Sequence, residues 1–291
     1  NRSPDVPFDQ SINPYRGCEH GCIYCYARPT HAYLGLSPGL DFETRLFAKP
    51  EAARLLKKEL ARPGYRCRPL AMGTNTDPYQ PVEKRWRITR EVLEVLSDCH
   101  HPVSLVTKSS LIERDLDLLA DLAARGLVEA YVSITTLDRR IARGMEPRAA
   151  APQRRLRTLR TLSEAGVPTG ALVAPVIPGL TDVELDAVLQ ESAEAGAQRA
   201  AYILLRLPLE VKELFQQWLE VHHPLKAKAV MSRVRETRGG RENDARFDHR
   251  MRGRGEYAAV IRKRFELACR RLGLNQSEIA LDATRFQPPI E

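Results

Sequence analysis

Long hydrophobic runs, aromatic residues and cysteines are all scarce in this sequence. No stretch approaches the roughly 18 consecutive apolar residues that indicate a membrane-spanning helix, and the longest apolar stretches, such as 170–177, have the length of a buried strand. Aromatic residues make up 6%, and 6 cysteines in 291 residues are too few for a secreted disulfide scaffold. We therefore expect a cytoplasmic protein that does not interact with a membrane. Because the sequence begins with Asn1 rather than Met, we expect the native N-terminus to lie upstream.

The composition is that of a globular protein. Apolar residues make up 43% and charged residues 28%, values that exclude collagen-like, mucin-like and wholly disordered chains. The length allows one large domain or two ordinary ones. The formal charge of +8 suggests an anionic partner, although whole-chain charge bears on solubility and non-specific binding rather than on fold.

Strand-like and helix-like segments alternate along most of the chain. We predict strands over 69–72, 103–107, 130–135, 169–174 and 200–205, and helices over 51–62, 88–96, 113–124, 152–165, 182–195 and 210–220. The first 50 residues are predicted to be mostly loop, with room for one more strand. Such alternation predicts an α/β fold, a partial (β/α)6 barrel of the TIM type, in which chemistry takes place at the carboxyl ends of the strands.

The positive charge is concentrated in one stretch of the sequence. Residues 226–271 contain 15 basic and 6 acidic residues, a net charge of +9, which leaves −1 for the rest of the chain. We therefore divide the chain into a core over 1–225 and a basic C-terminal extension over 226–291, with a loop over 237–255 and a helix over 257–272. The stretch 226–271 suits neutralisation of nucleic-acid phosphates. An acidic protein partner and a plain solvated surface are the alternatives.

Three of the six cysteines lie in one short segment. Cys18, Cys22 and Cys25 have the spacing C-x3-C-x2-C, and three thiolates on one loop can hold three irons of a cubane cluster. The fourth iron then stays open to a substrate or cofactor. Gly17 and Gly21 allow a tight loop around the cluster. A structural zinc site with His20 or His31 as fourth ligand is an alternative, but the chain has no second Cys or His pair of the usual spacing.

The cysteine motif resembles the signature of the radical S-adenosylmethionine (SAM) superfamily, in which an aromatic residue precedes the last cysteine, as Tyr24 does here. The resemblance implies a [4Fe-4S] cluster held by Cys18, Cys22 and Cys25, whose open iron is chelated by SAM. It also implies reductive cleavage of SAM to methionine and a 5′-deoxyadenosyl radical. A reducing partner such as flavodoxin or ferredoxin is expected.

A longer set of motifs is similar to the spore photoproduct lyase-like branch, also described as DNA repair photolyase-like. The matching segments are 24–26, 74–84, 107–109, 132–138, 146–147 and 175–182. The segment 28–43 further resembles an uncharacterised bacterial subgroup of that branch. These matches occur in order along the chain, from the cysteine segment to the residues that follow the predicted strand 169–174.

Several polar residues follow the predicted strands, where a SAM site is expected. Lys108 is expected to provide a positive charge for the SAM carboxylate. Thr76 and Asp77 are candidates for the SAM amino group, although Asp77 also suits a turn before Pro78. Ser133 and Thr135 share one face of a strand, and one of them is expected to bond the carboxylate or ribose. The adenine is expected near Tyr24 and the segment Val176–Ile177.

The resemblance implies catalytic roles for Tyr24 and Tyr26, which flank Cys25. In spore photoproduct lyase the matching tyrosines take part in returning a hydrogen atom to SAM. The family's hydrogen-donating cysteine is missing, because Thr74 stands near that position and Cys67 lies before the strand. This departure argues against repair of the thymine photoproduct itself. We interpret Arg148, Arg154 and Arg155 as a solvated helix face.

These observations lead to three hypotheses. The first is a radical SAM enzyme, lyase- or transferase-like, that repairs or modifies a nucleic acid. The second is a radical SAM enzyme that acts on a peptide, a protein or a small molecule. The third is a non-enzymatic iron–sulfur module that binds nucleic acid.

Overall fold

A computed structural model describes residues 3–277 and 279–289. Its centre is a parallel sheet of six strands in the order β1-β4-β5-β6-β7-β8. The strands are β1 (Gln10–Ile12), β4 (Leu70–Met72), β5 (Val103–Thr107), β6 (Val128–Ser133), β7 (Thr169–Val176) and β8 (Arg199–Leu204). β1 is the additional strand for which the sequence left room. The predicted α/β fold, a partial TIM-type barrel, is confirmed.

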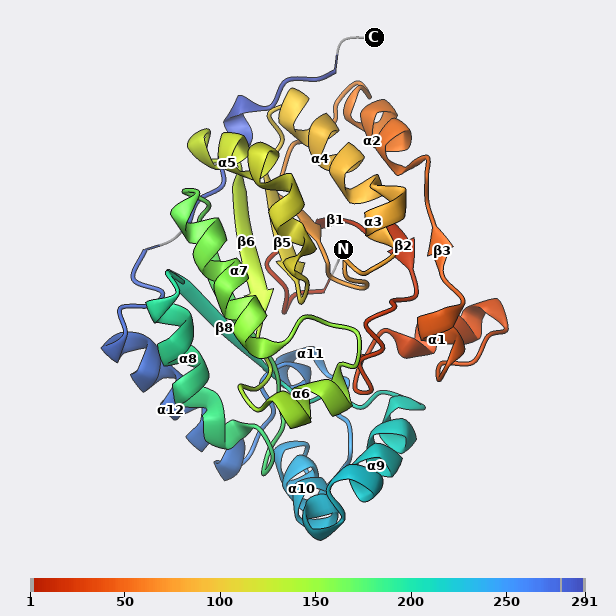
Figure 1. Ribbon diagram of the computed structural model, residues 1–291, viewed down its shortest axis with the longest axis vertical. Helices are drawn as coiled ribbons and strands as arrows, with labels where there is room; N and C mark the ends of the chain where they lie inside the picture. Colours follow the sequence, from red (N-terminus) through yellow and green to blue (C-terminus); the bar gives the residue numbers. More distant parts are fainter. Residues whose placement is uncertain (1–2, 278, 290–291) are drawn as a thin grey trace.

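The helices that connect these strands cover the outer face of the sheet (Figure 1). They are α2 (Ala52–Leu60), α4 (Ile88–Asp98), α5 (Leu116–Ala124), α7 (Pro152–Glu164) and α8 (Leu185–Glu194). Each turns apolar residues inward at helical spacing, as α4 does with Ile88, Val92, Leu93 and Leu96. α9 (Val211–His222) instead follows the last strand, and its buried side chains share a hydrophobic cluster with Tyr24 and Ile177. No helix of the described residues has the length and hydropathy that a membrane span would need.

Shorter elements lie near the carboxyl ends of the strands. β2 (Tyr15–Arg16) and β3 (Phe47–Ala48) form a two-stranded antiparallel sheet, and α1 (Asp41–Thr44) lies between them in sequence. α3 (Glu83–Trp86) follows β4, and α6 (Arg139–Met145) follows β6. Short 3-10 segments occupy 28–34, 110–115 and 182–184. A further one, over 283–285, lies near the amino end of β6, where the Asp282 N–H donates to the Gly126 carbonyl oxygen.

The C-terminal residues pack against the barrel. α10 (Pro224–Thr237) lies against α9, and α12 (Glu256–Arg271) lies against α8. Ala258, Ile261 and Phe265 of α12 belong to the same buried core as the strands. Two segments differ from the prediction. α10 was not predicted, because Lys and Arg stand between its apolar positions, and α11 (Phe247–Arg250) lies within the predicted loop over 237–255.

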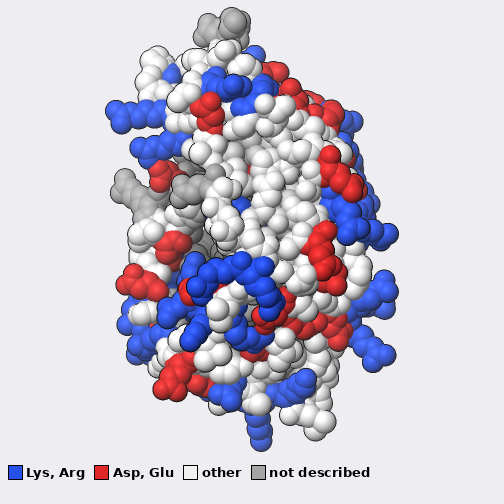
Figure 2. Space-filling view, turned by 90° about the vertical axis from the view of Figure 1, so that its left-hand side faces the viewer, with Lys and Arg blue, Asp and Glu red and all other residues white. Residues whose placement is uncertain are grey.

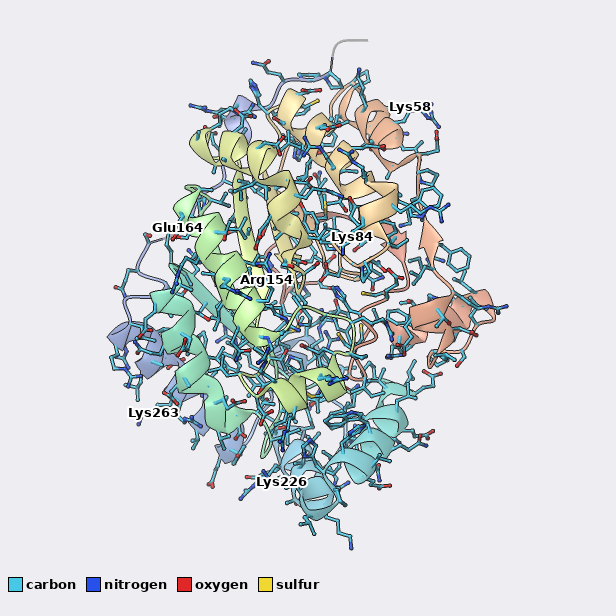
Figure 3. The ribbon with its side chains drawn as sticks, viewed as in Figure 1. Lys58, Lys84, Arg154, Glu164, Lys226 and Lys263 are labelled. Carbon is cyan, nitrogen blue, oxygen red and sulfur yellow. The ribbon has the colours of Figure 1, made fainter. Side chains whose placement is uncertain are left out.

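Part of the basic charge of residues 226–271 is neutralised within the molecule. Ion pairs with carboxylates engage Arg233, Arg235, Arg246, Arg250, Arg254 and Arg264. Arg238 is buried and donates to the carbonyl oxygens of Leu204 and Leu205. Lys226 on α10 and Lys263 on α12 lie at the periphery of the molecule (Figure 3). Figure 2 shows basic side chains interspersed with acidic ones on the left-hand face of Figure 1.

The packing of α12 predicts a large loss of stability for Phe265→Ala. Phe265 is 6% exposed and its ring lies 4.7 Å from that of Tyr202 on β8. Removing a buried phenylalanine costs about 3–5 kcal/mol of unfolding free energy. Leu267→Ala on the same helix is the matched control, because Leu267 is 49% exposed and its loss is expected to cost under about 1 kcal/mol. Chemical denaturation measures both; equal costs would contradict the packing of α12 on the core.

Candidate active site

The segment with the three cysteines lies at the carboxyl ends of the strands, and hydrogen bonds from side chains of the protein hold its backbone. The buried guanidinium of Arg28 donates to the carbonyl oxygens of Cys22 (2.9 Å) and Gly21 (3.0 Å). The Gln80 side-chain amide donates to the carbonyl oxygen of Gly17 (3.1 Å) and accepts from the Glu19 N–H (2.9 Å). Sequence reasoning missed both residues, whose contacts to the loop are made by tertiary structure.

The two glycines of this loop are required by its conformation. Gly17 and Gly21 have φ angles of 81° and 66°, in the left-handed region that favours glycine. A Cβ at Gly17 would lie 2.8 Å from the carbonyl oxygen of Phe42, closer than van der Waals contact allows. A Cβ at Gly21 would meet the side chains of Arg148 and Glu43. The predicted role of the glycines in a tight loop agrees with this geometry.

The three thiols suit cluster ligation by their chemistry. Cys18 and Cys22 are buried, and burial raises the pKa of each thiol, that of Cys22 to about 12. The neighbouring thiolates of Cys22 and Cys25 further raise the pKa of Cys18. Bound iron would offset this cost, because cations stabilise coordinated thiolates. Within the described residues, no three His, Cys, Asp or Glu side chains are arranged to hold a single metal ion; in a cubane cluster each thiolate binds its own iron.

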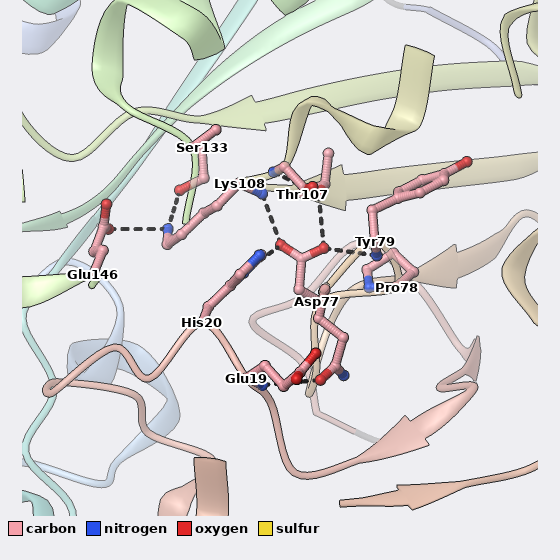
Figure 4. A network of polar contacts seen from close by, with 12 residues as sticks. Glu19, His20, Asp77, Pro78, Tyr79, Thr107, Lys108, Ser133 and Glu146 are labelled. Carbon is pink, nitrogen blue, oxygen red and sulfur yellow. Dashed lines mark hydrogen bonds and ion pairs between the residues drawn. The ribbon is translucent and has the colours of Figure 1, made fainter. Parts of the chain in front are cut away.

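Asp77 joins the cysteine loop to the ends of β4 and β5 (Figure 4). Its carboxylate accepts from the Thr107 hydroxyl (2.7 Å), the Lys108 N–H (2.7 Å) and the Tyr79 N–H (2.9 Å), and it faces His20 Nδ1 at 3.3 Å. Burial alone would raise the pKa of Asp77, but His20 and these donors lower it. The bond from the Tyr79 N–H is the one expected if Asp77 is a turn residue before Pro78. Binding of an amino group by Asp77 stays a prediction.

Thr76 bonds the backbone of β2 rather than Lys108 or Ser133. Its hydroxyl donates to the carbonyl oxygen of Tyr15 at 3.0 Å, and the side chain is buried. This bond fixes the segment after β4 against β2. The predicted contact of Thr76 with SAM remains a prediction, and it would require this hydroxyl to change partner or to accept a second bond.

Lys108 lies at the centre of three neighbouring strand ends. Its ammonium donates to Ser133 Oγ at 2.5 Å and to the carbonyl oxygen of Ala174 on β7 at 3.2 Å. The Ser133 hydroxyl donates to the same carbonyl oxygen at 3.3 Å, and the Thr135 hydroxyl oxygen lies 3.2 Å from it. The structure thus brings together Lys108, Ser133 and Thr135, which the sequence placed only in separate segments.

Tyr24 and Tyr26 have different surroundings. Tyr24 is 7% exposed, and its hydroxyl donates to the carboxylate of Glu146. Burial, followed by the charge of Glu146, raises its pKa well above the usual value. Tyr26 is 43% exposed, its hydroxyl donates to the carbonyl oxygen of Thr74, and the Arg206 guanidinium lies 4.7 Å from its ring. The catalytic roles implied for the two tyrosines stay predictions.

Val176 ends β7 and Ile177 follows it, beside the cysteine loop. Both are buried, and Ile177 shares a hydrophobic cluster with Tyr24 and Cys22. The Ile177 N–H donates to the Thr181 hydroxyl at 2.9 Å, which closes a tight turn after the strand. An adenine contact for this segment stays a prediction. Cys67, by contrast, precedes β4 and so lies at the other end of that strand from Thr74.

Two further residues of this region were missed or misread from the sequence. Glu146 is 2% exposed and bonds Tyr24 and Thr135. Arg155, which we interpreted as part of a solvated helix face, is 1% exposed and pairs with Glu146. Its helical spacing to the buried residues Thr158, Leu159 and Leu162 is the signal that would have placed it inside.

Comparison with known proteins adds a family and a fold. The family model described as "Radical SAM superfamily" matches residues 12–191. An uncharacterized protein of Mycobacterium tuberculosis strain H37Rv is 40% identical over 233 residues, which cover 79% of this chain and 67% of the relative. An uncharacterized protein of Methanocaldococcus jannaschii is 28% identical over 213 residues, or 73% of this chain and 76% of the relative.

Solved structures of spore photoproduct lyase have a similar fold. A tyrosine-to-phenylalanine variant matches with a TM-score of 0.61 at 16% identity, covering 89% of this chain and 73% of that one. The complex of the lyase with a dinucleoside spore photoproduct matches with a TM-score of 0.53 at 18% identity, covering 72% of this chain. The match extends over 59% of the length of the lyase in that complex. At such identities the likeness shows the fold alone.

The thiol arrangement predicts that each of Cys18→Ala, Cys22→Ala and Cys25→Ala prevents cluster assembly. Two remaining thiolates leave a second iron without its protein ligand. Iron and sulfide content and cluster absorption after anaerobic reconstitution measure the effect. Cys67→Ala is the control, because Cys67 lies outside the loop, and it is expected to assemble a cluster as the unaltered chain does. A full cluster in any of the three loop variants would contradict the ligand assignment.

Proposed function

Since this chain belongs to the radical SAM superfamily, we propose that it is a spore photoproduct lyase-like enzyme that repairs or modifies a nucleic acid. Membership of the superfamily makes the chain an enzyme and implies a [4Fe-4S] cluster and SAM as cofactors. When bound and reduced, the cluster supplies the electron that cleaves SAM and starts radical chemistry. The lyase-like reaction type, the substrate and the residue roles below are part of the proposal.

The convergence of Lys108, Ser133 and the Ala174 carbonyl oxygen beside the thiol loop carries this proposal. The Lys108 ammonium is within 2.5 Å of Ser133 Oγ and 3.2 Å of that carbonyl oxygen. It therefore provides a fixed positive charge for the SAM carboxylate. Ser133 and Thr135 would orient the carboxylate or ribose, and the apolar surface of Ile177 would pack against the adenine and exclude water.

A pocket next to this site supports a phosphate-bearing substrate. The pocket, of about 430 Å³, is lined by α6 and the start of α7 and includes Arg139, Arg140 and Arg143. All three side chains are exposed, and no carboxylate of the described residues forms an ion pair with them. Glu146 and Arg155 also line it, so its cations lie close to the proposed SAM site. Arginines of this kind bind phosphodiester oxygens without reading sequence.

The exposed cations of residues 226–271 are a second candidate surface for the same nucleic acid. The ion pairs described above reduce the number of free cations there, so we assign the region a supporting role. A peptide, a protein or a small molecule remains the second candidate substrate class, because binding of the SAM carboxylate by Lys108 would serve radical chemistry on any of them. We also propose flavodoxin or ferredoxin as electron donor and the cytoplasm as location.

Transfer of deuterium to 5′-deoxyadenosine tests the proposed substrate class. The reconstituted chain is incubated anaerobically with SAM, a reductant and either a deuterated nucleic-acid pool or a deuterated protein digest. We expect 5′-deoxyadenosine in both, with deuterium only from the nucleic acid. Deuterium from the digest alone would contradict the nucleic-acid proposal. Absence of 5′-deoxyadenosine together with absence of deuterium in recovered SAM, with an intact cluster, would contradict the assignment of SAM cleavage.

The α6 pocket predicts a weaker and less salt-dependent interaction for the Arg139→Gln/Arg140→Gln variant. Each lost phosphate contact lowers the slope of log affinity against log salt by about 0.7–0.9, so two lost contacts lower it by about 1.5. Lys57→Gln/Lys58→Gln is a control of equal charge on α2, whose exposed lysines lie far from α6 (Figure 3). Titrations with a single-stranded oligonucleotide measure both. Equal slopes for the two variants would contradict the pocket.

A further inference from the structure

Glu146 is a buried carboxylate at which three parts of the proposed active site meet. One oxygen, Oε1, accepts from the Tyr24 hydroxyl of the cysteine loop and from the Thr135 hydroxyl, which lies 2.8 Å away after β6. The Lys108 ammonium after β5 lies 3.7 Å from the same oxygen (Figure 4). The other oxygen, Oε2, pairs with Arg155 on α7. A single side chain therefore connects the cysteine loop to the ends of two strands.

Arg155 keeps this carboxylate charged and in place. Burial alone would raise the pKa of Glu146, but Arg155 and Lys108 lower it to about 2, so the group is an anion at neutral pH. Arg155 is itself fixed by bonds from Nη1 to the Ser133 carbonyl oxygen (3.0 Å) and from Nε to the Ala150 carbonyl oxygen (2.6 Å). With each of its three nitrogens bonded to an oxygen, the guanidinium has a fixed orientation and holds the Glu146 carboxylate in place.

The charges around Lys108 leave one positive charge for a ligand. Arg155 and Glu146 form a buried pair of zero net charge. Lys108 bonds neutral oxygens at 2.5 and 3.2 Å, whereas its distance to Glu146 is 3.7 Å. Glu146 thus attracts the ammonium towards the strand ends without forming a short ion pair with it. The charge of Lys108 remains available to an anionic group such as a carboxylate.

We propose that Glu146, locked by Arg155, is the positioning residue of the SAM site. It orients the Lys108 ammonium, the Thr135 hydroxyl and the Tyr24 ring before SAM binds, so that the SAM carboxylate meets a preformed positive charge. The inference rests on the proposed function, in which Lys108 binds that carboxylate. It adds a residue with no ligand contact of its own, which acts through the groups that contact SAM.

Equilibrium binding of SAM to the reconstituted, reduced protein tests the proposal. Binding is followed by the change that SAM produces in the electron paramagnetic resonance spectrum of the cluster, and iron content and thermal unfolding are measured beside it. For Glu146→Gln we expect the SAM dissociation constant to rise about tenfold or more, as for the loss of a charge-assisted contact. For decarboxylated SAM, which lacks the group that Lys108 meets, we expect a change of less than about threefold.

Two variants separate positioning from stability. Glu146→Gln/Arg155→Met removes both buried charges, so it leaves no guanidinium unpaired. If Glu146→Gln alone does not assemble a cluster, SAM binding is measured on this double variant instead. We expect it to regain thermal stability but not SAM affinity. Glu113→Gln is the matched control, because Glu113 pairs with Arg154, the neighbour of Arg155 on α7; its SAM affinity is expected to equal that of the unaltered chain.

The outcomes distinguish this inference from the proposed function. If Lys108→Gln leaves SAM affinity unchanged, the assignment of Lys108 is wrong and the proposed site fails. If Lys108→Gln weakens SAM binding but Glu146→Gln does not, only the positioning role is wrong. Equal losses for SAM and decarboxylated SAM in Glu146→Gln, or full recovery of SAM affinity in the double variant, would also overturn the inference.

Discussion

The ion pair between Glu146 and Arg155 is the interaction on which the proposed active site depends. Two opposite charges are both at most 2% exposed, and removing either would leave the other buried and unpaired, at a cost of about 3–5 kcal/mol. The pair fixes the positions of its neighbours, because its hydrogen bonds extend to Tyr24, Thr135 and the carbonyl oxygen of Ser133. The ends of β5 and β6 and the cysteine loop are joined through one carboxylate.

A second set of contacts holds the cysteine loop against the strand ends. Arg28 binds its carbonyl oxygens, Gln80 spans its beginning, and Asp77 faces His20 between Cys18 and Cys22. These contacts define the conformation of the loop, so folding itself contributes to bringing the three thiols together. The contacts of Asp77 also attach the loop to the ends of β4 and β5, next to Lys108.

The sequence allowed some of these features to be predicted and not others. The spacing of Cys18, Cys22 and Cys25 and the place of Lys108 and Ser133 after strands are local signals, and parallel strands bring their carboxyl ends to one edge. Glu146 lies in the matching segment 146–147, and Arg155 has the helical spacing of a buried residue. Neither signal identifies their partners, which are set by tertiary packing. Arg155 stands next to the half-buried Arg154, so charge alone suggested solvent. α10 was missed although Ala227, Val230, Met231 and Val234 have helical spacing.

The central claim is that the SAM carboxylate binds at Lys108 in a position set by Glu146. A crystal structure of the anaerobically reconstituted protein with SAM tests it most directly. The account predicts a cluster on Cys18, Cys22 and Cys25, and the SAM carboxylate within hydrogen-bonding distance of the Lys108 ammonium, with Glu146 still bonded to Arg155, Tyr24 and Thr135. A carboxylate bound elsewhere, with the Lys108 ammonium still on Ser133 and the Ala174 carbonyl oxygen alone, would contradict it.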